Sequence, residues 1–450
     1  MSAQSADRSH RQPNVVIILP DQLRWSALGC YGNPVIKSPN INRLADEGVR
    51  FTHAFSNFPV CSPARSTLLT GRYARSNGVN QNQDPECQSG RSTTTHTTLA
   101  EALAAAGYKT ALVGKWHLFP KPQALGFQQS LRANYPHGYF KQKFTVNEKE
   151  VYYHQGYGPF YETEKAVEFI RLNRDRPFFL YFSPHPPHMP IADLPNKYKN
   201  MYQPDELPIR PNAIKDGKPA YNEEWFKIYM WEHRYLRNPD TYPEKLPEGM
   251  DLRDLTALYY GQITAIDDCV GQVMKALKDN AIDADTIVVF TTDHGDLLGS
   301  HQLFNKNHHY IEACRIPMMV RYPRKLTPRV IDKQVISLID VMPTILELCG
   351  VSVPPSVQGL SMDAVLTSRQ TVIGENAAYI ETTSSDGIRT LRYMYAIERE
   401  SGNELLFDVE ADPYEMNNLI DRPTYKKILL AMREKVKSWQ KQTTEFKFEK

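Results

Sequence analysis

The sequence predicts an α/β fold, in which a large, mostly parallel central sheet is flanked by helices and followed by a small C-terminal antiparallel sheet plus helix subdomain. Two observations predict it. The first is a set of short apolar runs typical of strands buried on both faces of a parallel sheet, at residues 15–19, 110–113, 177–182 and 286–290. The second is a later set of strands spaced for antiparallel pairing, expected at 378–381, 390–397 and 404–408.

Amphipathic or glycine-terminated segments between the apolar runs predict the helices. Helices are expected at residues 39–49, 97–106, 163–172, 252–277 and 342–348, and two more strands at 315–322 and 335–341. A closing helix carries one apolar face formed by Ile428, Leu429, Met432, Val436 and Trp439. Asp267 and Asp268 are adjacent in the longest helix and point to different sides, so a structural or solvated role is expected.

The chain is expected to divide into a disordered N-terminal tail (1–13), a large α/β domain (14–360) and a C-terminal α+β subdomain (361–450). A polar, proline-rich stretch at about 192–250 resembles a lid-like insertion that roofs a ligand crevice. Residues 123–161 are loop-rich and aromatic. They favour equally a platform for a sugar ring and a loop that packs its own rings over the core.

Composition excludes some classes of function. The 450 residues carry a net charge of +2, so no global electrostatic footprint for nucleic acid is present. No segment approaches the apolar length of a membrane span, and no signal peptide is recognisable, so the chain is expected to be cytoplasmic as given, or periplasmic or secreted if a leader was removed. Six cysteines lack paired or zinc-ligand spacing, and five of them are expected to be buried free thiols.

One stretch, Phe58 to Arg72, combines small, hydroxyl-bearing and basic residues in the order FPVCSPARSTLLTGR. Pro63 fixes the backbone just after Cys61, and the following residues are expected to enter a helix whose N-terminal amides point toward the thiol. Arg65 and Arg72 add cationic donors. The segment is therefore suited to binding an anion.

Polar groups follow each of the four predicted parallel strands. They are Asp21 and Gln22, Lys115 and His117, His185 and His188, and Asp293 and His294. Because the carboxyl ends of parallel strands meet at one edge of a sheet, these side chains are expected to share one crevice. Lys306, in the block GSHQLFNKNHHY, is expected nearby.

The pattern Cys-x-Pro-x-Arg with the trailing Leu-Thr-Gly-Arg, together with these pairs, resembles the type I sulfatases of the alkaline-phosphatase-like superfamily. The resemblance implies that Cys61 is oxidised to formylglycine, whose hydrate supplies the nucleophilic oxygen, and that a sulfate ester is hydrolysed. It implies a metal site formed by Asp21, Gln22, Asp293, His294 and the modified Cys61. It also implies that charge neutralisation and sulfate binding come from Arg65, Lys115 and Lys306. Of the histidines, the resemblance implies that His117 is a base, that His188 is the acid that protonates the leaving group, and that His185 is a substrate contact.

Two positions depart from the family's usual pattern. Gln22 stands where a second Asp is common, and His294 where Asn is common. Ca²⁺ is the expected metal, but an imidazole and a neutral amide also suit Mn²⁺ or another borderline cation. The expected partners are a sulfated small molecule or saccharide and a formylglycine-generating maturation enzyme, with no nucleic acid and no membrane.

Two alternatives stay open. A phosphonate monoester or phosphodiester hydrolase of the same superfamily uses the same matured cysteine and resembles this chain in its Asp-Gln and Asp-His pairs. A non-catalytic sulfoglycan-binding protein is the other alternative, in which Cys61 remains a thiol.

Overall fold

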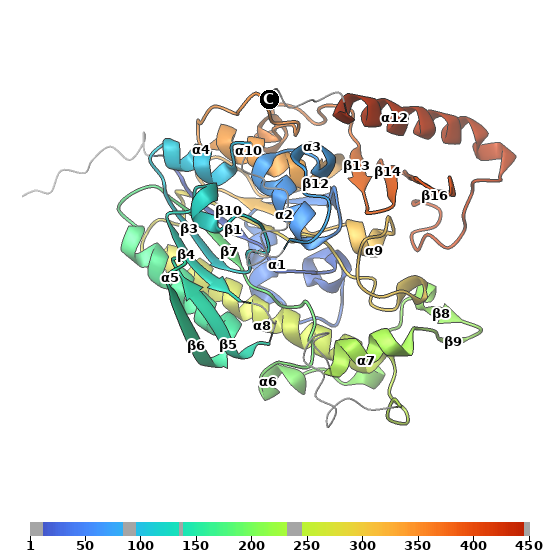
Figure 1. Cartoon of the computed structure of the whole chain (residues 1–450), viewed down its shortest axis with the longest axis horizontal. Coiled ribbons are helices and arrows are strands. Elements are labelled where there is room, and N and C mark those ends of the chain that lie inside the picture. The colour runs from blue at the N-terminus through green and yellow to red at the C-terminus, as the bar shows by residue number, and fades with distance from the viewer. Residues whose placement is uncertain (1–11, 84–95, 135–137, 232–244, 445–450) are drawn as a thin grey trace, which may run out of the picture.

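The computed structural model describes residues 12–83, 96–134, 138–231 and 245–444. The expected tail therefore lies almost wholly outside the described residues, as do Cys87, Arg234 and Arg237. Figure 1 shows a large sheet with helices on both faces and, at the C-terminal end of the chain, a smaller sheet beneath a long helix. This arrangement confirms the predicted fold class.

The large sheet has ten strands in the order β12-β2-β11-β10-β1-β7-β3-β4-β5-β6. Its strands are β1 (Asn14–Ile18), β2 (Val49–Phe55), β3 (Lys109–Gly114), β4 (Gln129–Ala133), β5 (Phe140–Val146), β6 (Glu150–Tyr157), β7 (Phe178–Ser183), β10 (Thr286–Thr291), β11 (Met318–Arg321) and β12 (Arg329–Ser337). The run from β10 to β4 is parallel, and so is the β12–β2 pair, whereas β11, β5 and β6 are antiparallel to their neighbours.

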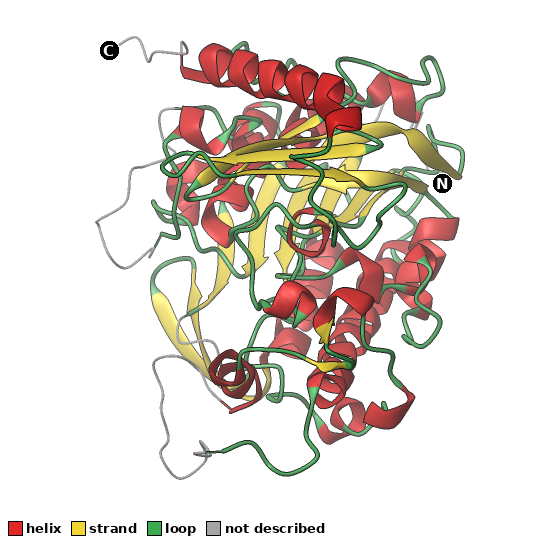
Figure 2. Ribbon diagram, turned by 90° about the vertical axis from the view of Figure 1, so that its right-hand side faces the viewer, coloured by secondary structure: helices red, strands yellow, loops and turns green. Residues whose placement is uncertain are grey.

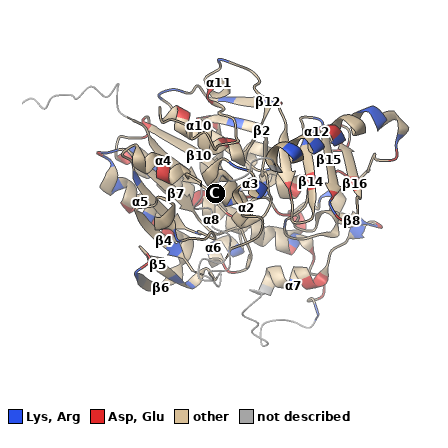
Figure 3. Cartoon of the chain, turned by 45° about the horizontal axis from the view of Figure 1, so that its top comes forward, with Lys and Arg blue, Asp and Glu red and all other residues tan. Residues whose placement is uncertain are grey.

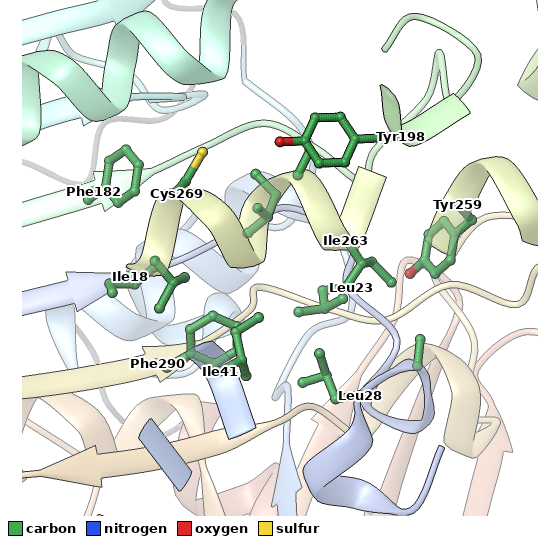
Figure 4. Close-up of a cluster of buried hydrophobic side chains, with 14 of the residues drawn as sticks. Ile18, Leu23, Leu28, Ile41, Phe182, Tyr198, Tyr259, Ile263, Cys269 and Phe290 are labelled. Atoms are coloured by element: carbon green, nitrogen blue, oxygen red, sulfur yellow. The ribbon is translucent and has the colours of Figure 1, made fainter. Parts of the chain in front are cut away.

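Alternate residues of the central strands bury the two faces of this sheet. Ile18, Phe182 and Phe290 face α8 (Leu252–Asp279), and Figure 4 shows them beside Ile263 and Cys269 of that helix. The same core includes residues of α1 (Pro39–Asp46) and α5 (Gly158–Asn173). The opposite face packs against α2 (Cys61–Thr70), α4 (Leu99–Ala105) and α10 (Val341–Leu348). Burial on both faces is why these strands are continuous apolar runs.

The structural role expected for Asp267 is confirmed. Its carboxylate is buried in α8 and accepts from the backbone N–H groups of Asn40 and Ile41, at 3.1 and 2.7 Å, which lie in the first turn of α1. Asp268 instead pairs with Lys197 at 3.1 Å. The carboxylate of Asp267 thus fastens one helix to the N-terminus of another.

The C-terminal sheet is antiparallel, in the order β13 (Ala378–Glu381), β14 (Ser385–Arg389), β15 (Tyr393–Glu398) and β16 (Glu404–Asp408). It packs against α12 (Lys426–Thr444) through Leu429, Met432 and Val436, as the apolar face of that helix predicts. Figure 2 shows α12 lying across this sheet. Charges of both signs are scattered over the face seen in Figure 3, in keeping with the near-zero net charge.

The shorter elements join these layers. They are α3 (Ala74–Asn77), α6 (Asn196–Lys199), α7 (Glu223–Trp231), α9 (Ile311–Cys314), α11 (Asp363–Leu366), β8 (Ile214–Lys215) and β9 (Lys218–Pro219). Of these, α6, α7, β8 and β9 belong to the stretch expected to be an insertion, and Tyr198, Phe226 and Tyr229 from it join the main core. Within the described residues, no helix combines the length and the apolar character needed to cross a lipid bilayer.

Several predicted boundaries were wrong. The helix expected to run to Val49 ends at Asp46, because the alternating residues from Val49 onward form β2. The stretch expected to be loop-rich, 123–161, contains β4, β5 and β6. Within it Tyr139 packs against Tyr157 in the core, and Tyr152 packs against Tyr161. The strand expected at 335–341 ends at Ser337, and β14 was missed.

Candidate active site

Cys61 is the first residue of α2, where the chain turns away from β2. The residue is buried, with 1% of its surface exposed. Ser62 fixes the turn, because its hydroxyl donates to the His117 carbonyl at 2.5 Å and accepts from the Gln83 backbone N–H at 2.9 Å. Arg72 lies beyond the other end of α2 and donates to the Ser356 carbonyl, so it is not part of this site.

Three further side chains converge on Cys61. Asp21, Asp293 and His294 each offer a ligand atom, and these atoms and the Cys61 Sγ lie within 4.8 Å of one another in a buried cluster. His294 Nδ1 lies 2.9 Å from the Gly295 carbonyl oxygen, so it is the N–H nitrogen, and Nε2 faces Sγ at 3.3 Å. Two carboxylates and an imidazole nitrogen, all buried, form a donor set that fits a divalent cation.

Gln22 lies beside this cluster with a left-handed backbone, at φ 64°. Its Nε2 donates to the Asp296 carboxylate at 2.7 Å and to the Tyr229 hydroxyl at 2.9 Å, while its Oε1 accepts from Lys306 at 2.7 Å. The amide oxygen therefore points to the side of the site where Lys306 and Cys61 lie.

Arg65 lies between the two carboxylates of the cluster and is completely buried. It donates to Asp21 Oδ2 at 3.0 Å, to Asp293 Oδ2 at 3.1 Å and to the Ser183 hydroxyl at 2.7 Å. Its nitrogens are thus engaged by protein oxygens. The structure shows Arg65 holding the two carboxylates in place, and its expected neutralisation of substrate charge stays a prediction.

Two lysines flank the cysteine. Lys115 Nζ lies 2.5 Å from Asp21 Oδ2 and 3.7 Å from Cys61 Sγ, and Lys306 Nζ lies 3.1 Å from Sγ. Lys115 directly follows Gly114, whose φ is +108°, and a Cβ there would lie 2.2 Å from the Ser183 carbonyl oxygen. Glycine at the end of β3 therefore lets the strand approach β7 closely while Lys115 turns into the site.

This surrounding charge distinguishes Cys61 from the other thiols. Burial and the Asp21 carboxylate raise the pKa of Cys61, but Lys115, Lys306 and His294 outweigh them and hold it well below its ordinary value. Burial instead raises the pKa to about 12 in the four other cysteines that the structure describes, Cys30, Cys269, Cys314 and Cys349. These four are free thiols, and only Cys30 is not fully buried.

The three candidate histidines lie close to Lys115 or to Cys61. His185 Nε2 lies 3.2 Å from Lys115 Nζ, and the rings of His185 and His188 are 5.0 Å apart. Burial, followed by the charges of Lys306 and Lys115, lowers the pKa of His188 to about 4. Burial and then Lys115 lower the pKa of His117, which adopts φ 56°. Hydrogen bonds with the Cys61 side chain oppose both shifts.

Every residue expected at the site therefore lies at this edge of the sheet, although the role of each stays a prediction. Asp296 and Tyr229, which hold Gln22, were not predicted as site residues. Neither was Tyr139, whose hydroxyl donates to the His188 carbonyl. Asp296 could have been suspected from its place three residues after Asp293, whereas nothing in the sequence marks the two tyrosines.

Comparison with known proteins agrees with this geometry. Residues 13–351 match the family model described as Sulfatase, and residues 299–442 match the model described as N-sulphoglucosamine sulphohydrolase, C-terminal. The chain is 31% identical to an ulvan-active sulfatase of Formosa agariphila, over 92% of this chain and 78% of that protein. It is 28% identical to a multifunctional alkaline phosphatase superfamily protein of Trinickia caryophylli, over 95% of both.

A solved structure from Bacteroides fragilis, assigned to the sulfatases, has 28% sequence identity and a TM-score of 0.83, and the match covers 98% of both chains. The family match spans most of the large domain and includes the Cys61 turn and both strand ends that carry the carboxylates. The chain therefore belongs to the sulfatase family, a group of sulfuric ester hydrolases in the alkaline-phosphatase-like superfamily.

Proposed function

We propose that this sulfatase removes a sulfate group from a saccharide, with a formylglycine derived from Cys61 as the nucleophile and one divalent metal ion at the Asp21 cluster. One observation carries the proposal. Cys61 Sγ lies 3.1 to 3.9 Å from Lys306 Nζ, His294 Nε2, Lys115 Nζ and Asp21 Oδ1. A nucleophile at this atom is thus surrounded by metal-ligand atoms on one side and by two cations on the other.

Asp21, Asp293 and His294 would hold the metal, together with Gln22 Oε1. The carboxylates and the amide suit Ca²⁺, and the imidazole makes Mn²⁺ or another borderline cation a second candidate. When bound, such an ion makes a hydroxyl more acidic and polarises a sulfate oxygen. Arg65 holds both carboxylates from behind, so their oxygens stay directed at the site in the absence of substrate.

Lys115 and Lys306 are the groups that bind the sulfate. Both ammonium groups lie within 4 Å of Sγ, at 3.7 and 3.1 Å, and they approach it from β3 and from the loop before α9. The hydrated aldehyde supplies an attacking oxygen at the position of Sγ. The two lysines stabilise the charge that spreads over the sulfate oxygens in the transition state, because fixed cations in a buried site need little reorganisation.

His188 donates a proton to the departing sugar oxygen. Its Nδ1 lies 2.8 Å from the Met189 carbonyl oxygen, so Nε2 is the nitrogen available to the leaving group. The depressed pKa of His188 arises partly from the two lysines, and the negative charge of a bound sulfate opposes their effect. His117 acts as the base that removes the proton of the remaining hydroxyl after sulfate transfer, so that sulfate leaves and the aldehyde returns.

A saccharide is the proposed substrate because the C-terminal match is to the N-sulphoglucosamine sulphohydrolase model. The bonds between Asn307 and Thr383, at 2.6 and 3.0 Å, bring the C-terminal sheet beside Lys306, so this subdomain contributes to the rim of the site. Residues of that rim would contact the sugar rather than the sulfate.

A phosphonate monoester or phosphodiester hydrolase is the second candidate. The Asp21-Gln22 and Asp293-His294 pairs favour it. Lys115 and His117 favour the sulfatase. Rates on 4-nitrophenyl sulfate and on 4-nitrophenyl phenylphosphonate separate the two, and a strong preference for the phosphonate would overturn our first choice.

The decisive experiment is the mass of the tryptic peptide Phe51–Arg65 from protein co-expressed with a formylglycine-generating enzyme. We expect the aldehyde, detected by its mass and by reaction with a hydrazide. A Cys61→Ala variant, which has neither a thiol nor a hydroxyl at Cβ, serves as the control that cannot form the aldehyde. A peptide that keeps an alkylatable thiol, in protein that binds sulfated sugars without hydrolysing them, would favour the non-catalytic binding protein.

A further inference from the structure

A second cavity lies away from the cysteine, between the large sheet and the C-terminal sheet. Its volume is about 510 Å³, which is within the usual range for small-molecule sites. The cavity is lined from one side by Trp25, His53, Phe55 and Arg315, and from the other by Arg389, Arg392 and Tyr414. None of the proposed catalytic or metal-binding residues lines it.

Arginines dominate the charge of this lining. Three of the four have carboxylate partners: Arg210 pairs with Glu312, Arg389 with Glu415 and Arg392 with Asp408. Arg315 has no carboxylate partner in the described part of the chain. Its guanidinium lies 3.8 Å from the centre of the Trp25 ring and donates to the Thr52 carbonyl. Arg315 is therefore a partly buried cation whose charge no carboxylate of the described residues neutralises in an ion pair.

Hydrogen-bond donors on the same lining also lack acceptors. Among the described residues, the Nε atoms of Arg315 and Arg389 and the Nε1 of Trp25 are buried and have no hydrogen-bond partner. Arg389 as a whole is 2% exposed. Buried donors without acceptors cost free energy, so three of them around one cavity indicate a missing acceptor, either water or an oxyanion. The unpaired charge of Arg315 favours the oxyanion.

We propose that this cavity is a second oxyanion site, which binds a sulfate group outside the catalytic crevice. Arg315 provides the charge, and the Nε–H groups of Arg315 and Arg389 and the indole N–H of Trp25 provide donors. The cavity volume exceeds what a bare sulfate fills, so the group can be carried on a sugar residue. The proposal does not depend on the reaction at Cys61, because none of these residues belongs to the site around that cysteine.

The position of β14 relates the two sites. The strand begins at Ser385, two residues after Thr383, which bonds to Asn307 beside Lys306. It ends at Arg389, which lines the cavity. Four residue steps along a strand span about 13 Å. A saccharide with more than one sulfate group could therefore be held at a distance from the group that is removed.

Calorimetric titration with sodium sulfate, at ionic strength held constant with chloride, tests the site. We expect two sulfate sites in the full-length wild-type protein, and one in a Lys115→Ala variant, in which catalytic sulfate binding is impaired. Arg315→Gln should weaken the second site about tenfold or more. Arg171→Gln, on the exposed face of α5, removes one charge elsewhere and should change neither site. No sulfate binding by the Lys115→Ala variant would overturn the proposal.

A second measurement covers the case in which Arg315→Gln does not fold. Crystals of the wild-type protein soaked in sodium selenate should show an anomalous peak between Arg315 and Arg389, and an empty or water-filled cavity would refute the oxyanion site.

Titration of Lys115→Ala with glucose 6-sulfate, glucose and inorganic sulfate identifies the source of the anion. Tighter binding of glucose 6-sulfate indicates a saccharide site, and equal binding of the sulfate ion indicates a site for the free ion. Binding of glucose as tight as that of glucose 6-sulfate contradicts the proposal.

Discussion

Gln22 donates from Nε2 to the Asp296 carboxylate across 2.7 Å, and this contact sets the orientation of the Gln22 amide. A flipped amide would place its oxygen against the carboxylate. Lys306 donates to Oε1 from the opposite side, at 2.7 Å. Asp296 thus fixes the amide whose oxygen is directed toward Lys306.

We predict that Asp296→Asn weakens metal binding. The backbone N–H of Leu298 donates to Asp296 Oδ1 at 2.8 Å, so it would fix the amide oxygen of the new asparagine there and turn its NH₂ toward Gln22 Nε2. Two donors would then face each other. Calorimetric titration with Ca²⁺ and Mn²⁺ should show a dissociation constant about 10 to 100 times higher. Asp268→Asn, near Lys197, is the control, and equal affinity in both variants would contradict this role for Asp296.

Arg65→Lys should destabilise the protein as well as reduce its activity. Lysine keeps the charge, but its three N–H donors radiate from one atom, whereas Arg65 reaches Asp21, Asp293 and Ser183 with three separate nitrogens. We expect the free energy of unfolding to fall by about 2 to 4 kcal/mol, measured by urea denaturation. Arg171→Lys on the surface should have no measurable effect. An Arg65→Lys variant of normal stability would show that the two carboxylates do not need the guanidinium.

Glu162 makes stability depend on pH. Its carboxyl group is buried in α5, neither oxygen has a hydrogen-bond partner in the described part of the chain, and burial raises its pKa to about 8. In the unfolded chain the carboxyl ionises near pH 4.5. Between these values the folded state holds a proton that the unfolded state has lost, so this group's contribution makes stability fall as pH rises from about 4.5 to 8.

Glu162→Gln should remove this dependence, because the amide has nearly the same shape and no charge. We expect the variant to be more stable than the wild type at pH 7.5, and the two to converge near pH 5, in melting temperatures measured across that range. Glu164→Gln alters an exposed neighbour on the same helix and should follow the wild type. A variant less stable than the wild type at pH 7.5 would mean that the carboxylate has a partner.

His188→Asn should affect substrates according to their leaving groups. A sugar alkoxide needs a proton as it departs, whereas 4-nitrophenolate does not. We expect the turnover number to fall by about 10²-fold or more on a sugar sulfate and far less on 4-nitrophenyl sulfate. His154→Asn, on β6, provides the control. Equal losses on both substrates would assign His188 to substrate binding instead of proton transfer.

The central strands were predictable because burial on both faces produces an unbroken apolar run, as in Phe178–Ser183. Strands at an edge lack that signal. In β5, Phe140 and Lys141 are exposed while Phe144 is buried, and Gln142 is buried as a polar residue, so neither periodicity nor composition marks a strand. In β14, the segment Ser385–Arg389 is short, contains Gly387 and is mostly polar, although most of it is buried.

The candidate site likewise has features that the sequence predicts and features that it does not. Residues directly after predicted strands, such as Asp21 and Asp293, could be placed at one edge of the sheet from topology alone. The hydrogen-bond partners of these side chains could not be predicted in this way. The bonds from Arg65 to both carboxylates were not predicted, and Tyr229 reaches Gln22 from an α-helix 207 positions away in the chain. Tertiary packing, which local sequence does not record, decides such contacts.

The burial of Cys61 has a consequence for the order of events during biosynthesis. The whole of α2 is enclosed, and the residue is 1% exposed. An enzyme that oxidises the thiol must bind the surrounding segment in an extended form, which the folded chain does not offer. The modification we propose therefore has to precede folding, so that the speed of chain collapse and the supply of maturation enzyme together set the fraction of active molecules a cell produces.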